Sequence, residues 1–207
     1  MIMSTTFVAF PKIARLNRDI VITEKLDGTN AAVVITTEVE TGRLIVQAQS
    51  RSRLLSTESK DKDNFGFARW VEDNATALEA LGPGHHFGEW YGRGIQRGYG
   101  LDERRFALFN VNRWAFDPNQ SALFPAIKES VPGLELVPVL YRGPRLIVNE
   151  DAASIWVYGL RVRGSFAVPG YMNPEGIVVF HSASRAMYKV TLEGDSQWKG
   201  PAAQSPS

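Results

Sequence analysis

The chain has 207 residues, of which 44% are hydrophobic and 22% charged, and 23 Lys and Arg against 22 Asp and Glu give a net charge of +1. This near-neutral balance excludes a strongly basic protein that binds nucleic acid without specificity. No apolar run is long enough for a membrane span, Met1 to Arg15 lack the core of a signal peptide, and no cysteine is present for disulfides or thiolate metal sites. We therefore expect an intracellular, cytoplasmic protein that makes no contact with membranes.

The first half of the chain predicts mainly strands. Leu44, Val46 and Ala48 alternate with longer polar residues, as in a half-buried strand, and Gly42 marks the turn before them. The helix predicted in this half is Asn64–Leu81, in which apolar residues recur on one face until Gly82-Pro83-Gly84 ends it. The predicted strands are Ile20–Thr23, Ala31–Thr37, Arg43–Ser50, His86–Tyr91 and Arg105–Trp114.

The second half mixes helices with strands. Pro138 lies inside the predicted strand Leu134–Tyr141, which favours an edge strand or a bulge because proline cannot donate a ladder hydrogen bond. Asn149 is a plausible N-cap for a helix over Asp151–Leu160. The other predicted elements are a helix over Phe124–Val131 and strands over Gly176–His181 and Ala186–Leu192. The apolar run Ile177-Val178-Val179 indicates that the first of these two strands is buried. Strands joined by hairpins, without regular crossover helices, indicate an α+β fold.

A run near the N-terminus, Glu24-Lys25-Leu26-Asp27-Gly28-Thr29-Asn30, sets a lysine between a predicted strand and a tight turn. We expect Asp27 to accept local backbone hydrogen bonds and Gly28 to supply a positive φ. An ordinary lysine is a protonated ammonium at neutral pH, and a cleft at a strand end can desolvate it and fix its direction for nucleophilic attack. Taken alone, the run also fits a surface hairpin turn with a chance lysine.

Four further segments change this interpretation. In chain order they are Phe87-Gly88-Glu89-Trp90-Tyr91-Gly92, Phe106-Ala107-Leu108-Phe109-Asn110-Val111, Pro174-Glu175-Gly176-Ile177-Val178-Val179 and Tyr188-Lys189-Val190-Thr191. Together with the first run they resemble the motifs of the covalent nucleotidyltransferase superfamily, and within it the RNA ligases of the RNA ligase 2 or editing-ligase type. The resemblance implies an α+β adenylation domain, similar to ATP-grasp domains, with antiparallel sheets flanked by helices. This domain is expected over residues 1–199, without an OB-fold appendage, followed by a disordered tail over residues 200–207.

The resemblance assigns roles to the earlier motifs. Lys25 would attack the α-phosphate of ATP, form a lysyl–AMP phosphoramidate and release pyrophosphate. Glu24 would help to read the base edge, and Asn30 would lie near the phosphates or the lysine turn; an exposed strand glutamate and a simple turn residue are the alternatives. Glu89 would contact the ribose or a metal-bound water, and Phe109 would stack on adenine, since an aromatic face binds any base. A strand acid paired to an arginine and simple core packing are the alternatives for Glu89 and Phe109, and Phe106 is expected in the core.

The later motifs would serve the phosphates and a metal ion. Glu175 would be the carboxylate that binds Mg²⁺ or Mn²⁺, together with Glu89, and Lys189 would neutralise charge that develops on the α-phosphate. The last motif of the family usually carries two lysines separated by one residue, whereas this chain has only Lys189 in that segment. Lys199 is the candidate for the second charge.

Two basic clusters stand out along the chain, and each fits either a nucleic-acid contact or a solvated surface. By resemblance, Arg51, slightly preferred over Arg53, would serve the phosphates or the nucleic-acid end, both side chains pointing alike on a strand. The clusters are Arg51, Arg53, Lys60 and Lys62, and Arg93, Arg97, Arg104 and Arg105.

The same resemblance distinguishes RNA from DNA ligases. Thr29 and Asn30 follow the glycine, as in RNA ligases, where DNA ligases usually carry an arginine. Eight residues follow Lys199, too few for the OB-fold that DNA ligases and capping enzymes append. We expect an ATP-dependent ligase that transfers AMP to a 5′-phosphate end of RNA or of a nicked duplex and seals it to a 3′-hydroxyl, with a partner protein as a possible source of a missing domain. A degenerate domain that binds a nucleotide or RNA end without turnover and a stand-alone DNA nick ligase are the alternatives.

Overall fold

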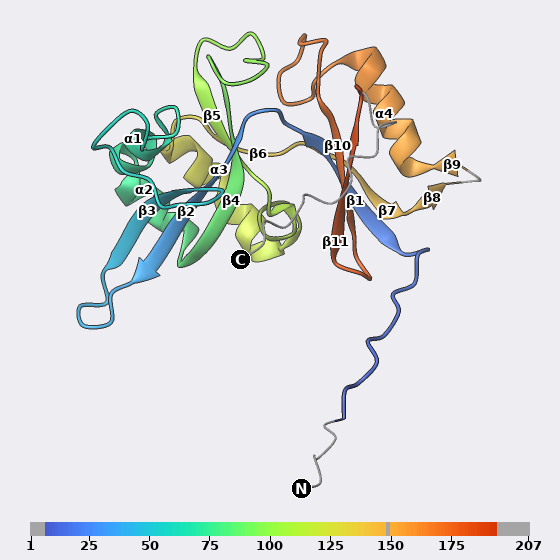
Figure 1. The fold of residues 1–207 in the computed structure, drawn as a ribbon, viewed down its shortest axis with the longest axis horizontal. Helices are drawn as coiled ribbons and strands as arrows, with labels where there is room; N and C mark the ends of the chain where they lie inside the picture. The colour runs from blue at the N-terminus through green and yellow to red at the C-terminus, as the bar shows by residue number, and fades with distance from the viewer. Residues whose placement is uncertain (1–6, 148–149, 194–207) are drawn as a thin grey trace, which may run out of the picture.

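The computed structural model describes residues 7–147 and 150–193, which form two β-sheets lying side by side with helices on their outer faces (Figure 1). The four-stranded sheet has the order β11 (Ala186–Thr191), β10 (Gly176–His181), β1 (Asp19–Lys25), β7 (Val139–Pro144). The five-stranded sheet has the order β3 (Leu44–Ser50), β2 (Thr29–Thr37), β4 (Gly84–Gly92), β5 (Arg104–Leu108), β6 (Leu134–Leu136). Within the described ladders, only β5 and β6 pair in parallel. The expected α+β architecture of antiparallel sheets flanked by helices is confirmed.

Along each strand, successive side chains point to opposite faces of the sheet. The apolar side chains on the outer face of each sheet are buried against helices. Helices α1 (Phe67–Asp73), α2 (Ala75–Leu78) and α3 (Pro118–Ser130) cover the five-stranded sheet, and α4 (Ala152–Arg163) covers the four-stranded one (Figure 1). The rings of Phe67 and Phe106, with centroids 4.9 Å apart, join α1 to β5. A third core lies between the sheets and includes Val21, Leu26, Tyr91, Tyr99, Ala107, Val111 and Val137. This third core fixes the two sheets around the β1–β2 connection.

The chain crosses from one sheet to the other at Val137-Pro138, so the prediction of one strand over Leu134–Tyr141 is wrong. Its two halves are β6 and β7, which lie at the edges of different sheets. Pro138 has no N–H to donate, and its carbonyl accepts the backbone N–H of Glu24 at 3.0 Å. The register of β1 against β7 shifts beside it, between Ile22 and Thr23. The expected edge position is confirmed for both strands, whereas Pro138 itself lies between them and the bulge falls within β7, opposite Ile22 and Thr23.

The predicted helix over Asn64–Leu81 is divided into α1, α2 and a 3₁₀ turn over Glu79–Leu81. Its first residues are not helical, because Asn64 and Phe65 have φ values of 50° and 55°. Asn74 separates α1 from α2, and its Nδ2 donates to the carbonyl of Trp70 at 2.8 Å. An asparagine side chain that competes for backbone groups in this way weakens a helix interior.

Three further boundaries differ from the prediction. The strand predicted over Arg105–Trp114 ends at Leu108, because the carbonyl and the Oδ1 of Asn110 accept the N–H groups of Trp114 and Arg113, each at 3.1 Å, and start a π-helical turn. Helix α3 begins at Pro118, where the Asp117 carboxylate caps the N–H groups of the first turn. Helix α4 is capped by Asp151, whose carboxylate accepts the N–H of Ala153 at 2.9 Å. The predicted cap, Asn149, lies outside the described residues.

The segment predicted as a disordered tail, residues 200–207, and Lys199 also lie outside the described residues. A short two-stranded ladder, β8 (Leu146–Ile147) with β9 (Glu150–Asp151), precedes α4. None of the helices in residues 7–147 and 150–193 combines the length and the apolar character needed to cross a membrane.

Candidate active site

Lys25 is the last residue of β1, at the point where the chain leaves the four-stranded sheet. It stands opposite Gly176, the first residue of β10. Its Nζ lies 2.5 Å from Oε1 of Glu175, and the two side chains are 23% and 17% exposed. The fold thus brings together two predicted site residues that lie 150 positions apart in the chain.

The turn after Lys25 is held by long-range contacts. Leu26 is buried in the core between the sheets, the backbone N–H of Asp27 donates to the hydroxyl of Tyr99 at 2.9 Å, and the Asp27 carboxylate pairs with Arg97 at 3.0 Å. The Asp27 carboxylate therefore forms an ion pair across the fold in place of the expected local backbone hydrogen bonds. The expected positive φ at Gly28 is wrong as well. Glycine is needed there for space, because a Cβ would lie 2.3 Å from the carbonyl oxygen of Trp90.

Glu89 on β4 binds the same turn from the five-stranded sheet. Its Oε1 accepts the N–H of Gly28 at 3.0 Å, and its Oε2 accepts Nδ2 of Asn30 at 2.8 Å. The side chain is 7% exposed. Burial raises the pKa of Glu89 to about 7, although these two hydrogen bonds and the charge of Lys25 act in the opposite direction. Glu89 is therefore a buried carboxyl group that connects the lysine turn to the second sheet.

The pKa of Glu89 leads to a prediction about stability. Because the folded protein holds this proton more tightly than the unfolded chain, the contribution of Glu89 is fully present below pH 4.5 and is lost as the pH rises through about 7. We expect the free energy of unfolding to fall by up to roughly 3 kcal/mol over this range because of Glu89, at about 1.4 kcal/mol per pKa unit.

Denaturant unfolding of wild type and Glu89→Gln across this pH range measures the effect. The Gln variant should lack this part of the pH dependence, whereas Glu40→Gln, an exposed position in the β2–β3 turn, should retain it. If the free energy of unfolding changed equally with pH in wild type and in Glu89→Gln, this would contradict the prediction.

Glu175 precedes β10, whose residues Ile177 and Val179 are buried against α4 as the apolar run predicted. Gly176 allows β10 to lie close to β11 at this point, since a Cβ there would lie 2.1 Å from the carbonyl oxygen of Val190 on β11. Oε2 of Glu175 is buried and has no hydrogen-bond partner. A buried carboxylate oxygen without a partner suits a cation, because Mg²⁺ and Mn²⁺ prefer oxygen ligands. No group of three or more His, Cys, Asp or Glu side chains in the described part of the chain forms a metal cluster.

Lys189 lies on β11 opposite Val178, which in turn faces Thr23 on β1. Residues paired in this way project from the same face of a sheet. Lys189 is therefore on the face of Lys25, one row further along the strands, and it is exposed. Lys25 itself pairs with Gly176 on β10, which in turn pairs with Thr191 on β11. The second lysine of the family motif would stand at Thr191 or at Met187, which is 73% exposed.

Glu24 is 1% exposed and already has hydrogen-bond partners on both carboxylate oxygens. Oε1 accepts the hydroxyl of Ser165 at 2.6 Å, and Oε2 accepts the N–H groups of Phe166 and Ala167 at 2.7 and 2.9 Å. Burial outweighs these bonds and raises the pKa of Glu24. Its side chain thus anchors the loop after α4 to the strand that carries Lys25, and its role toward a base edge stays a prediction.

Phe109 follows β5 and is 41% exposed, so core packing does not account for its ring. Its N–H donates to the carbonyl of Phe87 at 2.9 Å, which extends the β4–β5 ladder by one pair. Phe106 is fully buried against α1, as expected for a core residue. The stacking role of Phe109 toward adenine stays a prediction.

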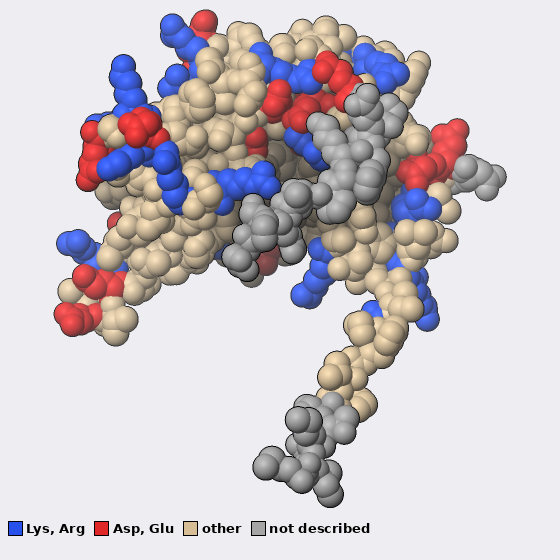
Figure 2. All heavy atoms as spheres, in the orientation of Figure 1, with Lys and Arg blue, Asp and Glu red and all other residues tan. Residues whose placement is uncertain are grey.

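The two basic clusters are not continuous basic patches. Arg51 and Arg53 follow β3 in a tight turn instead of lying on the strand; Arg51 is exposed, and Arg53 donates to the carbonyl of Asp61. In the second cluster Arg105 pairs with Glu103 and Glu135. In Figure 2, basic and acidic side chains are interspersed over the visible face.

Arg97 stood out in the sequence only as a member of a basic cluster, yet it contacts three segments around Lys25. Nε pairs with Asp27 at 3.0 Å, Nη1 donates to the carbonyl of Asn173 at 3.3 Å, and Nη2 pairs with Glu193 at 3.2 Å. Its side chain is 16% exposed. Arg97 therefore connects the lysine turn to the segments on either side of Glu175 and β11. The neighbouring residues in Arg93-Gly94-Ile95-Gln96-Arg97 do not predict this role.

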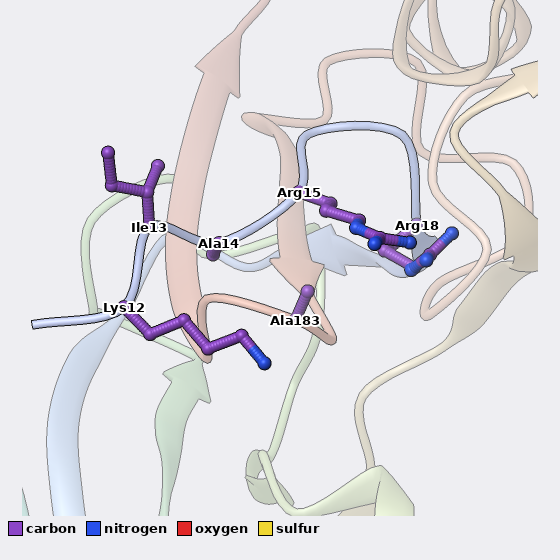
Figure 3. Close-up of a pocket in the computed structure, with 6 residues that line it drawn as sticks. All are labelled: Lys12, Ile13, Ala14, Arg15, Arg18 and Ala183. Carbon is purple, nitrogen blue, oxygen red and sulfur yellow. The ribbon is translucent and has the colours of Figure 1, made fainter.

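A recess of about 560 Å³ lies elsewhere, between the N-terminal segment and the β10–β11 turn (Figure 3). Because Asp19 begins β1 and Lys25 ends it, this recess is at the far end of the strand from the lysine. It is lined by Lys12, Ile13, Ala14, Arg15, Arg18 and Ala183. It is therefore separate from the site around Lys25.

Solved structures of RNA ligases share this fold of two sheets that meet at the strand-end Lys25. Form 1 of an archaeal ATP-dependent RNA ligase matches with a TM-score of 0.55 at 20% identity, over 89% of this chain and 48% of that one. A Naegleria gruberi RNA ligase variant with ATP and Mn matches with a TM-score of 0.55 at 18% identity, over 85% of this chain and 50% of that one. The chain thus spans about half the length of these structures.

The chain belongs to the RNA ligase family, whose family model matches residues 18–191. This match covers the strand that carries Lys25 and reaches the end of β11. No curated protein matches the sequence.

Proposed function

We propose that this protein is an ATP-dependent RNA ligase that works through a covalent lysyl–AMP intermediate on Lys25. The observation that carries the proposal is the contact of Lys25 with Glu175, next to a turn that Glu89 binds from the other sheet. The family match supports the reaction class, and the Naegleria gruberi RNA ligase structures with ATP and Mn or with AMP and Mn support the nucleotide and the metal.

The first step uses Nζ of Lys25 as the nucleophile. Nζ forms a bond to the α-phosphorus of ATP while the bond from that phosphorus to the pyrophosphate oxygen breaks. The proton of Nζ passes to the carboxylate of Glu175, which is in hydrogen-bond contact with it. Lys189, exposed on the same face, neutralises charge on the α-phosphate.

A divalent cation, Mg²⁺ or Mn²⁺, would be held by Glu175, with Glu89 close to the same turn. It would supply charge neutralisation for the phosphates. Phe109 offers its exposed ring to adenine. Asn30 pairs with Glu89, and Arg51 follows β3 next to the start of β2, so both can serve the phosphates. Glu24 and Lys199 remain candidates for further nucleotide contacts.

The second and third steps join the RNA ends. An oxygen of the RNA 5′-phosphate attacks the AMP phosphorus, the bond to Nζ breaks, and Lys25 regains its proton. The RNA 3′-hydroxyl then attacks the activated 5′-phosphorus and displaces AMP, and the proton of the hydroxyl passes to water. A partner protein that supplies an additional domain for sealing is part of the proposal.

The substrate is tested with labelled 5′-phosphorylated strands, ATP and Mg²⁺. We expect adenylated RNA, or sealed RNA when a nick is supplied, and less product from the matched DNA strands. Preference for DNA would support the nick-ligase alternative. Nucleotide binding that protects against heat without pyrophosphate release would support the degenerate-domain alternative.

Arg97 gives a prediction that separates positioning from chemistry. Arg97→Lys keeps the charge but cannot bridge Asp27, Asn173 and Glu193 together. Since small misplacements of reacting groups can cost about 100-fold in rate, we expect AMP labelling of Lys25 to slow by roughly 10- to 100-fold.

The measurement is the initial rate of labelling at saturating ATP, together with the melting temperature of each variant. Arg93→Lys, an exposed position in the same loop, is the matched control and should label at the wild-type rate. Equal rates for all three proteins would contradict a positioning role for Arg97.

A further inference from the structure

Next to Phe109, the ring proposed for adenine, lie two further aromatic side chains, Phe87 and His85, which have no role in the reaction described above. Phe87 is 52% exposed and stands directly opposite Phe109, to which it is joined by a backbone hydrogen bond of 2.9 Å. The ring of His85 stacks on Phe87, with centroids 5.8 Å apart and an interplanar angle of 18°. We call His85, Phe87 and Phe109 the aromatic row.

The sheet register places the aromatic row on the inner face of the five-stranded sheet. Phe87 is two residues from Glu89 on β4, so the two side chains project from the same face about 7 Å apart. The intervening Gly88 belongs to the opposite face, where a Cβ would lie 2.6 Å from the ring of Phe106 and where α1 packs. Phe87 therefore takes no part in the core between this sheet and its helices.

The neighbours of Phe87 leave its ring accessible. Ala32 on β2 is its cross-strand partner, and this small residue is 1% exposed while the phenyl ring above it is half exposed. Isolated exposed hydrophobic residues are common, but here two exposed phenylalanines face each other across the extended β4–β5 ladder, and one of them carries a stacked imidazole. The stacked pair of His85 and Phe87 is preformed, since it already exists in the structure.

The chemistry of the surroundings fits a nucleobase. Gln49 and Gln47 of β3 face Ala32 and Val34 and so lie on the same side as the aromatic row. Amide side chains hydrogen-bond to base edges, and aromatic faces stack on any base of a single strand. The exposed guanidinium of Arg51 follows this strand and can meet a phosphate.

We infer that Phe87, with His85 stacked on it, is a stacking position for a base of the RNA strand, next to the Phe109 position proposed for adenine. This inference rests on the proposed function and adds to it a substrate subsite. A nucleobase on Phe87 has two possible sources, the RNA strand and the adenine of ATP. The RNA strand is favoured because Phe109 already provides one ring for adenine.

The test measures two quantities on the same variants. The first is the affinity for a short fluorescent 5′-phosphorylated single-stranded RNA by anisotropy, and the second is covalent AMP by intact mass after ATP and Mg²⁺. We expect Phe87→Ala to bind this RNA roughly 5- to 100-fold more weakly and to be adenylated to the wild-type extent. Phe87→Trp, which keeps a π-face, should restore RNA binding.

The control is Tyr158→Ala, which removes an aromatic ring that is 69% exposed on α4; it should change neither quantity. RNA binding by Phe87→Ala equal to wild type, or no measurable RNA binding by the wild type, overturns the subsite. Loss of adenylation in a folded Phe87→Ala variant would assign the ring to adenine and would also overturn the RNA subsite. Absence of AMP on the wild type instead rejects the proposed function.

Discussion

Replacing Lys25 by arginine should abolish covalent AMP on the protein while leaving the fold intact. Arginine retains a positive charge that can pair with Glu175, but its guanidinium stays protonated and is no nucleophile. We therefore expect labelling below detection, a loss of at least about 1,000-fold, since a covalent pathway has no substitute for its nucleophile. The measurement is intact mass after incubation with ATP and Mg²⁺.

Lys128→Arg is the matched control for this change. Lys128 lies on α3, where its side chain is 52% exposed and 3.9 Å from Glu135. The control variant should acquire AMP at the wild-type rate. Labelling of Lys25→Arg at a comparable rate would show that another residue carries the nucleotide.

Replacing Glu175 by glutamine should have the second largest effect. Glutamine preserves the size of the side chain but removes the charge that contacts Nζ of Lys25 and the partnerless oxygen that suits a cation. We expect the adenylation rate to fall by roughly 100- to 1,000-fold, the magnitude typical of removing one preorganised electrostatic group. The labelling rate at several Mg²⁺ and Mn²⁺ concentrations measures this.

A metal role for Glu175 has a specific signature. The half-saturating metal concentration should rise in Glu175→Gln, whereas Glu129→Gln, at an exposed position on α3, should be unchanged. An unchanged rate and an unchanged metal dependence in Glu175→Gln would contradict both roles assigned to this carboxylate.

Local patterns predicted the strands that carry the candidate site. The apolar run Ile177–Val179 identified β10, and the run around Lys25 identified the end of β1, because a buried strand and its turn leave a signal within a few residues. The register between these two strands, which brings Glu175 to Lys25, depends on pairing across 150 positions. The resemblance to a family, not periodicity, was what connected them.

The parts that the sequence did not predict depend on contacts between distant segments. Arg97 binds Asp27 and Glu193, which are 70 and 96 positions away, and no local pattern predicts such partners. Glu24 is held by Ser165 and the two following N–H groups, a loop that has no signature in strand or helix propensity. The division of Leu134–Tyr141 between two sheets likewise reflects tertiary packing around Pro138.

Gly28 shows how a correct residue assignment can rest on the wrong reason. The turn does require glycine, but not because of a left-handed backbone. The constraint is space, since a Cβ at this position would lie 2.3 Å from the carbonyl oxygen of Trp90 and 2.8 Å from the Cβ of Tyr91. The close approach brings β4, and with it Glu89, against the lysine turn. The sterics of this glycine thus help to assemble the site from both sheets.

The most direct test of Lys25 as the residue that carries AMP is the mass of the intact protein after treatment with ATP and Mg²⁺, followed by peptide mapping. We expect one added AMP, located on the peptide that contains Lys25, and no addition after treatment with GTP. An unchanged mass, or AMP located on Lys189 or another residue instead of Lys25, would contradict it.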